Sequence, residues 1–227
     1  MPKAHFELAR AVLTTKPGRY LLLAALTVDV FVFPSLVAVG ALRPWATALS
    51  FAATLIAALL AVGEHRAARG LILAVVALAV AARLATLFLG ATAFLVAQVA
   101  TAGIASVAFG ALLLADVFSK GKVGDRMVAA LLAYLLIGLA FANAFAILDL
   151  AHPGAISLPG PGLTMAEFIY FSFSTLTSVG YGDLVPVHPF ARSLAMIEAL
   201  SGQLYLVLVV ARFVGDRPIA SPTHGEG

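Results

Sequence analysis

The stretch TLTSVGYGDLVP, residues 175–186, differs in character from the rest of the chain. It places two glycines, a tyrosine and an aspartate beside threonines and a serine. The chain as a whole is 62% hydrophobic and 11% charged, whereas a soluble domain carries about 25% charged residues. The balance is therefore that of a membrane protein. Within such a protein this stretch can neither continue a helix nor face lipid.

Six segments are long and apolar enough to cross a bilayer, which needs about 20 apolar residues per helix. We expect them at Tyr20–Val39, Trp45–Val62, Leu71–Leu89, Ala91–Leu114, Met127–Leu148 and Phe190–Val214. The sequence therefore predicts an all-α integral membrane fold with six transmembrane helices.

The basic residues indicate the orientation. Of the 14 Lys and Arg residues, eleven lie on one side of the predicted spans: Lys3, Arg10, Lys16, Arg19, Arg66, Arg69, Lys120, Lys122, Arg126, Arg212 and Arg217. Such an excess marks the cytoplasmic side. We expect both termini to be cytoplasmic, and the long connection between the fifth and sixth spans to be external.

That connection contains a segment too short to span, TMAEFIYFSFSTL at 164–176. Thr164 and Glu167 form the pattern of a capping box. We expect a re-entrant pore helix, followed by irregular backbone that must be buried in protein or line a water-filled cavity. One copy per chain cannot enclose a pore, so several subunits are implied.

The string TLTSVGYGD resembles the signature of potassium channels, and the resemblance extends over about residues 126 to 214. It implies a tetrameric, six-transmembrane, pore-loop channel with a selectivity filter between helices five and six. Backbone carbonyls replace the water of a potassium ion in such a filter, and glycine tolerates the dihedral angles required. The implied ion-binding residues are Ser178, Val179, Gly180, Tyr181 and Gly182, with potassium at the first four.

The same resemblance assigns supporting roles around the filter. Thr177 would lie at the base of the pore helix and Asp183 at the outer mouth, where Tyr170 could donate a hydrogen bond to it. Ser174 stands where some members of the family carry a glutamate paired with the outer aspartate, and Ser178 stands where threonine is usual. Gly202 occupies the position of an inner-helix gating hinge, although packing in a crowded bundle would equally explain a glycine there.

The first four predicted spans form a sensor-like domain without gating arginines, because the fourth span contains no basic residue. Gating charges supply about 2.3 kcal/mol per charge per 100 mV, so we expect no voltage gating. Two charges, Asp29 and Arg83, lie within the other three of these four spans. Charges inside a membrane are costly and usually paired, so we expect an ion pair between them.

The expected organisation is a cytoplasmic amphipathic segment (1–19), a sensor-like domain (20–118), a pore domain (119–214) and a short cytoplasmic tail (215–227). The expected function is passive, potassium-selective conduction, with a channel-like transporter subunit or an accessory membrane protein as alternatives. We expect no enzyme activity, no nucleic-acid partner and no cofactor other than permeant K⁺. The expected partners are three further copies of the chain and the lipids of a prokaryotic cell membrane.

Overall fold

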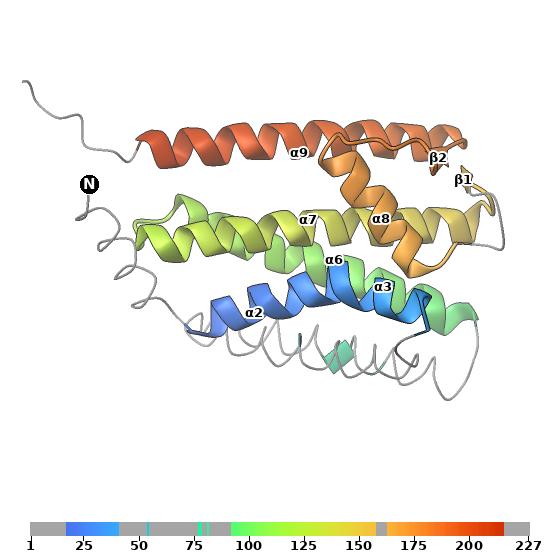
Figure 1. Cartoon of the computed structure of the whole chain (residues 1–227), viewed down its shortest axis with the longest axis horizontal. Coiled ribbons are helices and arrows are strands. Elements are labelled where there is room, and N and C mark those ends of the chain that lie inside the picture. The colour runs from blue at the N-terminus through green and yellow to red at the C-terminus, as the bar shows by residue number, and fades with distance from the viewer. Residues whose placement is uncertain are drawn as a thin grey trace, which may run out of the picture.

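The computed structural model describes residues 17–40, 54, 77–78, 81, 92–157 and 163–215. The first described helix, called the first helix below, consists of α2 (Pro17–Thr27), a π-helical turn (Val28–Val32) and α3 (Phe33–Ala38). It is followed by three long helices, α6 (Thr92–Phe118), α7 (Val123–Ala151) and α9 (Pro189–Gly215). The shorter α8 (Met165–Leu176) lies between α7 and α9 (Figure 1). Two short strands, β1 (Ile156–Ser157) and β2 (Val185–Pro186), pair antiparallel.

Three of the described helices are long and apolar enough to cross a membrane, at Val99–Phe118, Val123–Ala151 and Pro189–Gly215. They correspond to the fourth, fifth and sixth predicted spans. The first predicted span matches the described helix from Pro17 to Ala38. The second and third predicted spans lie outside the described residues.

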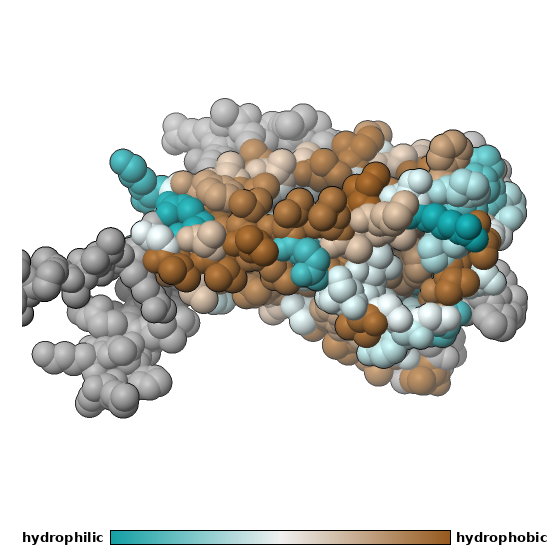
Figure 2. Space-filling view, turned by 90° about the horizontal axis from the view of Figure 1, so that it is seen from above, coloured by the Kyte–Doolittle hydropathy of each residue, from teal (hydrophilic) through white to brown (hydrophobic). Residues whose placement is uncertain are grey.

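The long helices lie side by side, and α8 is inclined between α7 and α9 (Figure 1). Much of the surface over them is hydrophobic, and hydrophilic residues gather near the end that carries β1 and β2 (Figure 2). This arrangement is the one expected for helices whose apolar flanks face lipid or neighbouring chains.

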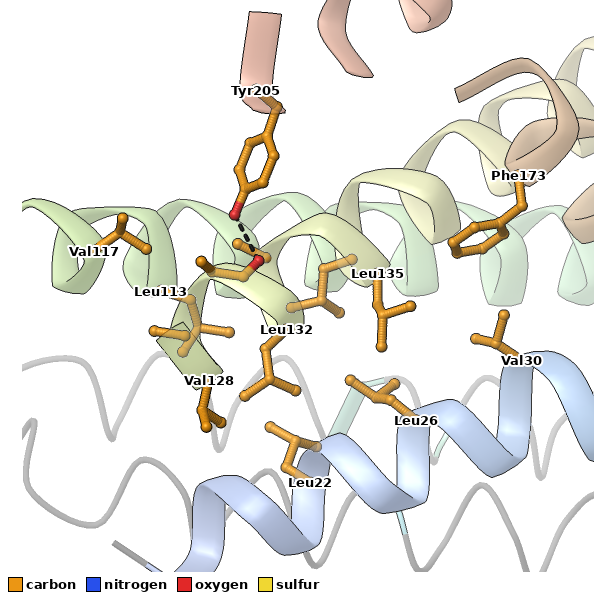
Figure 3. Close-up of a cluster of buried hydrophobic side chains, with 14 residues drawn as sticks. Leu22, Leu26, Val30, Leu113, Val117, Val128, Leu132, Leu135, Phe173 and Tyr205 are labelled. Carbon is orange, nitrogen blue, oxygen red and sulfur yellow. Dashed lines mark hydrogen bonds between the residues drawn. The ribbon is translucent and has the colours of Figure 1, made fainter. Parts of the chain in front are cut away.

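A cluster of buried apolar side chains joins five of the helices (Figure 3). It is made of Leu22, Leu26 and Val30 from the first helix, Leu113 and Val117 from α6, Val128, Leu132 and Leu135 from α7, Phe173 from α8 and Tyr205 from α9. The Tyr205 hydroxyl donates to the Ala130 carbonyl at 2.5 Å. This bond fixes α9 to α7 while satisfying a buried phenol.

Basic side chains tie the helices together at the end opposite the strands. Arg19 of α2 forms a largely buried ion pair with Asp116 of α6. The Arg126 Nε donates to the Val117 carbonyl at 2.9 Å, and its guanidinium carbon lies 5.2 Å from the ring centroid of Phe213. Such a cation–π contact attaches the last turn of α9 to the first turn of α7. The assignment of this end to the cytoplasm stays a prediction.

The predicted ion pair between Asp29 and Arg83 cannot be placed, because Arg83 lies outside the described residues. Asp29 itself lies in the π turn. It accepts a hydrogen bond at 2.5 Å from the Thr54 hydroxyl, so at least part of the stabilisation of this carboxyl comes from a neutral donor.

Candidate functional site

The short helix α8 begins at the predicted capping box. The Glu167 carboxylate accepts hydrogen bonds from the Thr164 backbone N–H, at 2.7 Å, and from the Thr164 hydroxyl. The helix ends after Leu176, where the Thr177 N–H and hydroxyl both donate to the Phe173 carbonyl, at 3.1 and 2.6 Å. Thr177 therefore lies at the base of this helix, as expected from the sequence.

The capping box predicts that the thermal stability of the protein falls at acidic pH. Burial acts to raise the pKa of Glu167, but the hydrogen bonds from Thr164 outweigh it and lower the pKa below its usual value. A lowered folded-state pKa means that the stabilisation is present above the unfolded-state pKa and is lost as the pH falls through the folded-state value. We expect Glu167→Gln to lower thermal stability at neutral pH and to flatten its acid dependence. Equal slopes of melting temperature against pH in the two proteins would contradict this.

The loop after α8 alternates in backbone handedness. Ser178, Gly180 and Gly182 have positive φ angles of 59°, 57° and 83°, and neither Val179 nor Tyr181 between them does. Ser178 is the non-glycine residue in this conformation, which L-residues rarely adopt. Alternation of this kind turns successive N–H groups to one side of the chain.

Those N–H groups point back at the end of α8. The N–H groups of Val179 and Gly180 both donate to the Ser174 carbonyl, at 2.9 and 3.2 Å, and the Ser178 N–H donates to the Thr175 carbonyl at 2.9 Å. A trans peptide holds its C=O opposite its N–H. The carbonyls of Ser178 and Val179, which belong to the peptides donating to Ser174, must therefore point away from α8.

The loop at 177–183 is exposed in the single chain. Val179 is 53% and Tyr181 71% exposed, although a valine and a tyrosine would ordinarily be at least partly buried. The adjoining face of α9 is also apolar and exposed; its exposed residues include Met196, Ile197, Leu200, Leu204 and Val207.

An aromatic pair and a carboxylate hold the end of the loop near Asp183. The Tyr170 hydroxyl donates to Asp183 Oδ2 at 2.9 Å, the contact expected from the sequence. The rings of Tyr170 and Tyr181 stack with centroids 5.9 Å apart. Partial desolvation, the hydrogen bond to Asp183 and the charge of that carboxylate raise the pKa of Tyr170. The phenol thus keeps its proton, and can donate, at a pH above that at which a free tyrosine loses it.

Two residues of α9 approach the start of the loop. Gly202 is buried against the last residue of α8: a Cβ built on it would lie 2.1 Å from the Leu176 carbonyl oxygen. The Gln203 side-chain amide donates to the Ser178 hydroxyl at 2.9 Å. Gly202 therefore allows α8 and α9 to approach each other closely. The helix α9 runs unbroken through Gly202. Its role as a gating hinge stays a prediction.

Sequence reasoning did not identify Gln203, nor Glu198, which is fully buried one turn before Gly202. A signal was present for both, because each is a strongly polar residue in a span that is otherwise apolar around them. Of the predicted site residues, the structure brings together Tyr170, Ser174, the loop 177–183 and Gly202. Asp29 lies apart from them in the first helix.

Comparisons with known proteins cover this same region. A family model described as "Ion channel" matches residues 130–215. The inward rectifier potassium channel Kirbac3.1 of Paramagnetospirillum magnetotacticum is 39% identical over 80 residues, 34% of this chain and 26% of that protein. Protein LctB of Geobacillus stearothermophilus is 43% identical over 65 residues (28% and 48%), and that of Bacillus caldotenax is 34% identical over 90 residues (37% and 66%). No solved structure matches the chain significantly.

The chain thus spans about a quarter of the first of these relatives, and 48% and 66% of the other two. The matched segment contains α7 from its second turn, α8, the glycine loop and α9. These matches, together with the apolar helices, indicate a membrane protein with an ion-channel segment over residues 130–215, and not an enzyme.

Proposed function

We propose that the chain is one subunit of a homotetrameric, potassium-selective channel whose filter is formed by residues 178–182. The observation that carries this proposal is the direction of the loop carbonyls. The N–H groups of Val179 and Gly180 are bonded to Ser174, so that the opposite carbonyls are free to bind a cation. A stack of such carbonyls can replace the hydration shell of K⁺.

The exposed surfaces of the single chain support a fourfold assembly. A single loop offers oxygens from one side only, and enclosing an ion requires further copies around an axis. The single chain exposes Val179, Tyr181 and the apolar face of α9. In a tetramer, partner copies would cover these surfaces. In this proposal α8 is a re-entrant pore helix, α7 the outer helix and α9 the inner helix of a six-span subunit.

Potassium flux tests the proposed function. Purified protein in liposomes is expected to pass K⁺ in strong preference to Na⁺, and native mass measurement is expected to find four copies per assembly. Selective flux through a monomer or dimer would contradict the tetramer. Transport of K⁺ that saturates or depends on a second ion would instead indicate the channel-like transporter subunit. Absence of any flux would indicate the accessory protein.

Voltage should have little influence on the opening of this channel. The helix α6 contains no Lys or Arg, and each charge that crosses the field contributes about 2.3 kcal/mol per 100 mV. We expect single-channel recordings to show an open probability that changes little with membrane potential. A steep dependence, equivalent to several gating charges per assembly, would contradict the prediction.

The Ser178 hydroxyl would complete the innermost ion site, and Gln203 holds it there at 2.9 Å. Serine lacks the β-methyl group that restricts side-chain rotation in threonine. The hydrogen bond from Gln203 therefore restrains the rotation of the Ser178 side chain instead. We expect Gln203→Leu to weaken block by internal Ba²⁺ about five-fold, the equivalent of one ordinary hydrogen bond. Unchanged block in Gln203→Leu would show that the amide does not orient the hydroxyl.

A further inference from the structure

The carboxyl of Glu198 is completely buried in the middle of α9, with an exposed fraction of 0%. It lies on the same helical face as Gly202 and Tyr205, four and seven residues later, and these too are buried. That face packs against α7 and α8, because Tyr205 bonds to Ala130 and Gly202 contacts Leu176. Glu198 therefore points away from the exposed face that would line or surround the pore.

Three helices meet at the hydroxyl of Ser172, which is also 0% exposed. The Ser172 Oγ lies 2.5 Å from Glu198 Oε1 of α9 and 2.7 Å from the Gly138 carbonyl oxygen of α7. Both distances are within the range of an O–H···O hydrogen bond.

A count of protons decides how these atoms bond. A serine hydroxyl has one proton to donate. If Glu198 were a carboxylate, Ser172 would face two acceptors with one proton, and one close contact would be repulsive. If Glu198 carries a proton, it donates to Ser172 and Ser172 donates to Gly138. Only the protonated acid satisfies both contacts.

The remaining carboxyl oxygen supports the same assignment. Glu198 Oε2 is buried without a hydrogen-bond partner, and no Lys, Arg or His pairs with Glu198 in the described part of the chain. The nearby titratable groups on the packed helices are the phenols of Tyr134 and Tyr205, whose rings lie tilted against each other with centroids 5.4 Å apart. A carboxylate would place half of its charge on this unpartnered oxygen, which is very costly, whereas a neutral carbonyl oxygen is tolerated.

We propose that Glu198 is a neutral carboxylic acid that positions the pore helix by a hydrogen-bond relay, in which Glu198 donates to Ser172 and Ser172 donates to the Gly138 carbonyl. The relay joins α9, α8 and α7 at one point. Ser172 stands two residues before Ser174, whose carbonyl holds the N–H groups of Val179 and Gly180. A displacement of α8 would therefore reach the filter directly, so Glu198 acts on conduction without touching the ion. The expected effect of Glu198 on flux rests on the proposed channel function. The protonation of Glu198 does not depend on that function.

The proton is tested by infrared spectroscopy of the full-length protein with and without ¹³C-labelled glutamate. The wild type is expected to show an isotope-sensitive carbonyl band of a protonated carboxyl, which Glu198→Gln removes. Ser172→Ala is expected to move that band to higher frequency, because the acid loses its acceptor. Absence of the band in the wild type overturns the proposal. The band is measured without any ion flux, so it decides this point even if the chain proves not to conduct.

The positioning role is tested by K⁺ flux per assembled protein in liposomes. Glutamine can donate to Ser172 as the neutral acid does, so Glu198→Gln is expected to keep flux and K⁺ over Na⁺ preference close to those of the wild type. Glu198→Leu and Ser172→Ala are expected to lower flux about ten-fold and to weaken the preference for K⁺. The control is Ser201→Ala, which removes a hydroxyl of α9 that bonds only its own helix at Ile197 and should leave flux unchanged.

The flux results separate three outcomes. Loss in Glu198→Leu with retention in Glu198→Gln supports the relay. A loss in Glu198→Gln as large as in Glu198→Leu overturns it, because the charge and not the proton would then be required. Wild-type protein that carries the band but passes no K⁺ contradicts the proposed channel, and leaves the protonated acid established.

Discussion

Gly202→Ala is expected to prevent formation of a stable, conducting protein. The added Cβ would lie 2.1 Å from the carbonyl oxygen of Leu176 and 3.1 Å from its carbonyl carbon. These are backbone atoms of the end of α8, and they cannot rotate away as a side chain can. Overpacking of a core costs about 1–3 kcal/mol, and occasionally more, and in the proposed tetramer it would recur in every subunit. Melting temperature and K⁺ flux of the purified protein measure the effect.

Gly110→Ala is the matched control for this variant. Gly110 is also a buried helical glycine, but its added Cβ would lie 3.6 Å from the Leu136 Cβ, an ordinary contact. Alanine favours a helix interior by about 0.8–1.0 kcal/mol over glycine, so Gly110→Ala should be neutral or stabilising. If Gly202→Ala keeps its melting temperature and loses only channel opening, the close-packing explanation is wrong and the hinge predicted from the sequence is supported.

Gly182→Ala is expected to abolish the preference for K⁺. The residue has a φ of 83°, which costs a residue with a Cβ about 1–2 kcal/mol. Relief of that strain would rotate the adjoining peptide and turn its carbonyl away from the ion path. We expect flux to fall sharply or to lose discrimination between K⁺ and Na⁺.

Gly154→Ala separates this effect from simple loss of stability. Gly154 has nearly the same φ, 81°, and a Cβ at either glycine would meet nothing within 4 Å of the single chain. It lies in the turn after α7, away from the loop. The two variants should therefore lose similar thermal stability, and only Gly182→Ala should change ion selectivity. Equal selectivity in both would show that the backbone at Gly182 does not direct a coordinating carbonyl.

The sequence predicts those features that depend on local chemistry. Uninterrupted apolar length predicts the last three spans to within a few residues, and the Thr164 and Glu167 pair marks the start of α8. The glycines predict the unusual dihedral angles at Gly180 and Gly182, but they do not predict the positive φ of Ser178. The hydrogen bond between Tyr170 and Asp183 follows from the tendency of a phenol to find a partner near the carboxylate of the loop.

Contacts between separate helices could not be predicted in this way. Glu198 and Ser172 are 26 residues apart, and Gln203 and Ser178 are 25 apart. Their meeting depends on the angle at which α8 is packed between α7 and α9. Without that angle, Glu198 is indistinguishable from a polar residue that faces a water-filled cavity. The ion pair expected between Asp29 and Arg83 stays a prediction, because Arg83 lies outside the described residues.

The π turn of the first helix carries a consequence for comparing this chain with other proteins. Its Phe33 N–H bonds to the Val28 carbonyl, five residues back instead of four, and such a turn holds one residue more than an α-helix needs. Phe31, within the turn, packs its ring edge-on against Phe173 of α8, with centroids 5.3 Å apart. A protein with a straight first helix would have one residue fewer here. An alignment of such a protein with this chain must place its gap within Val28–Val32. If the gap were moved to a loop, every residue of α3 would be rotated by about 100° relative to its counterpart.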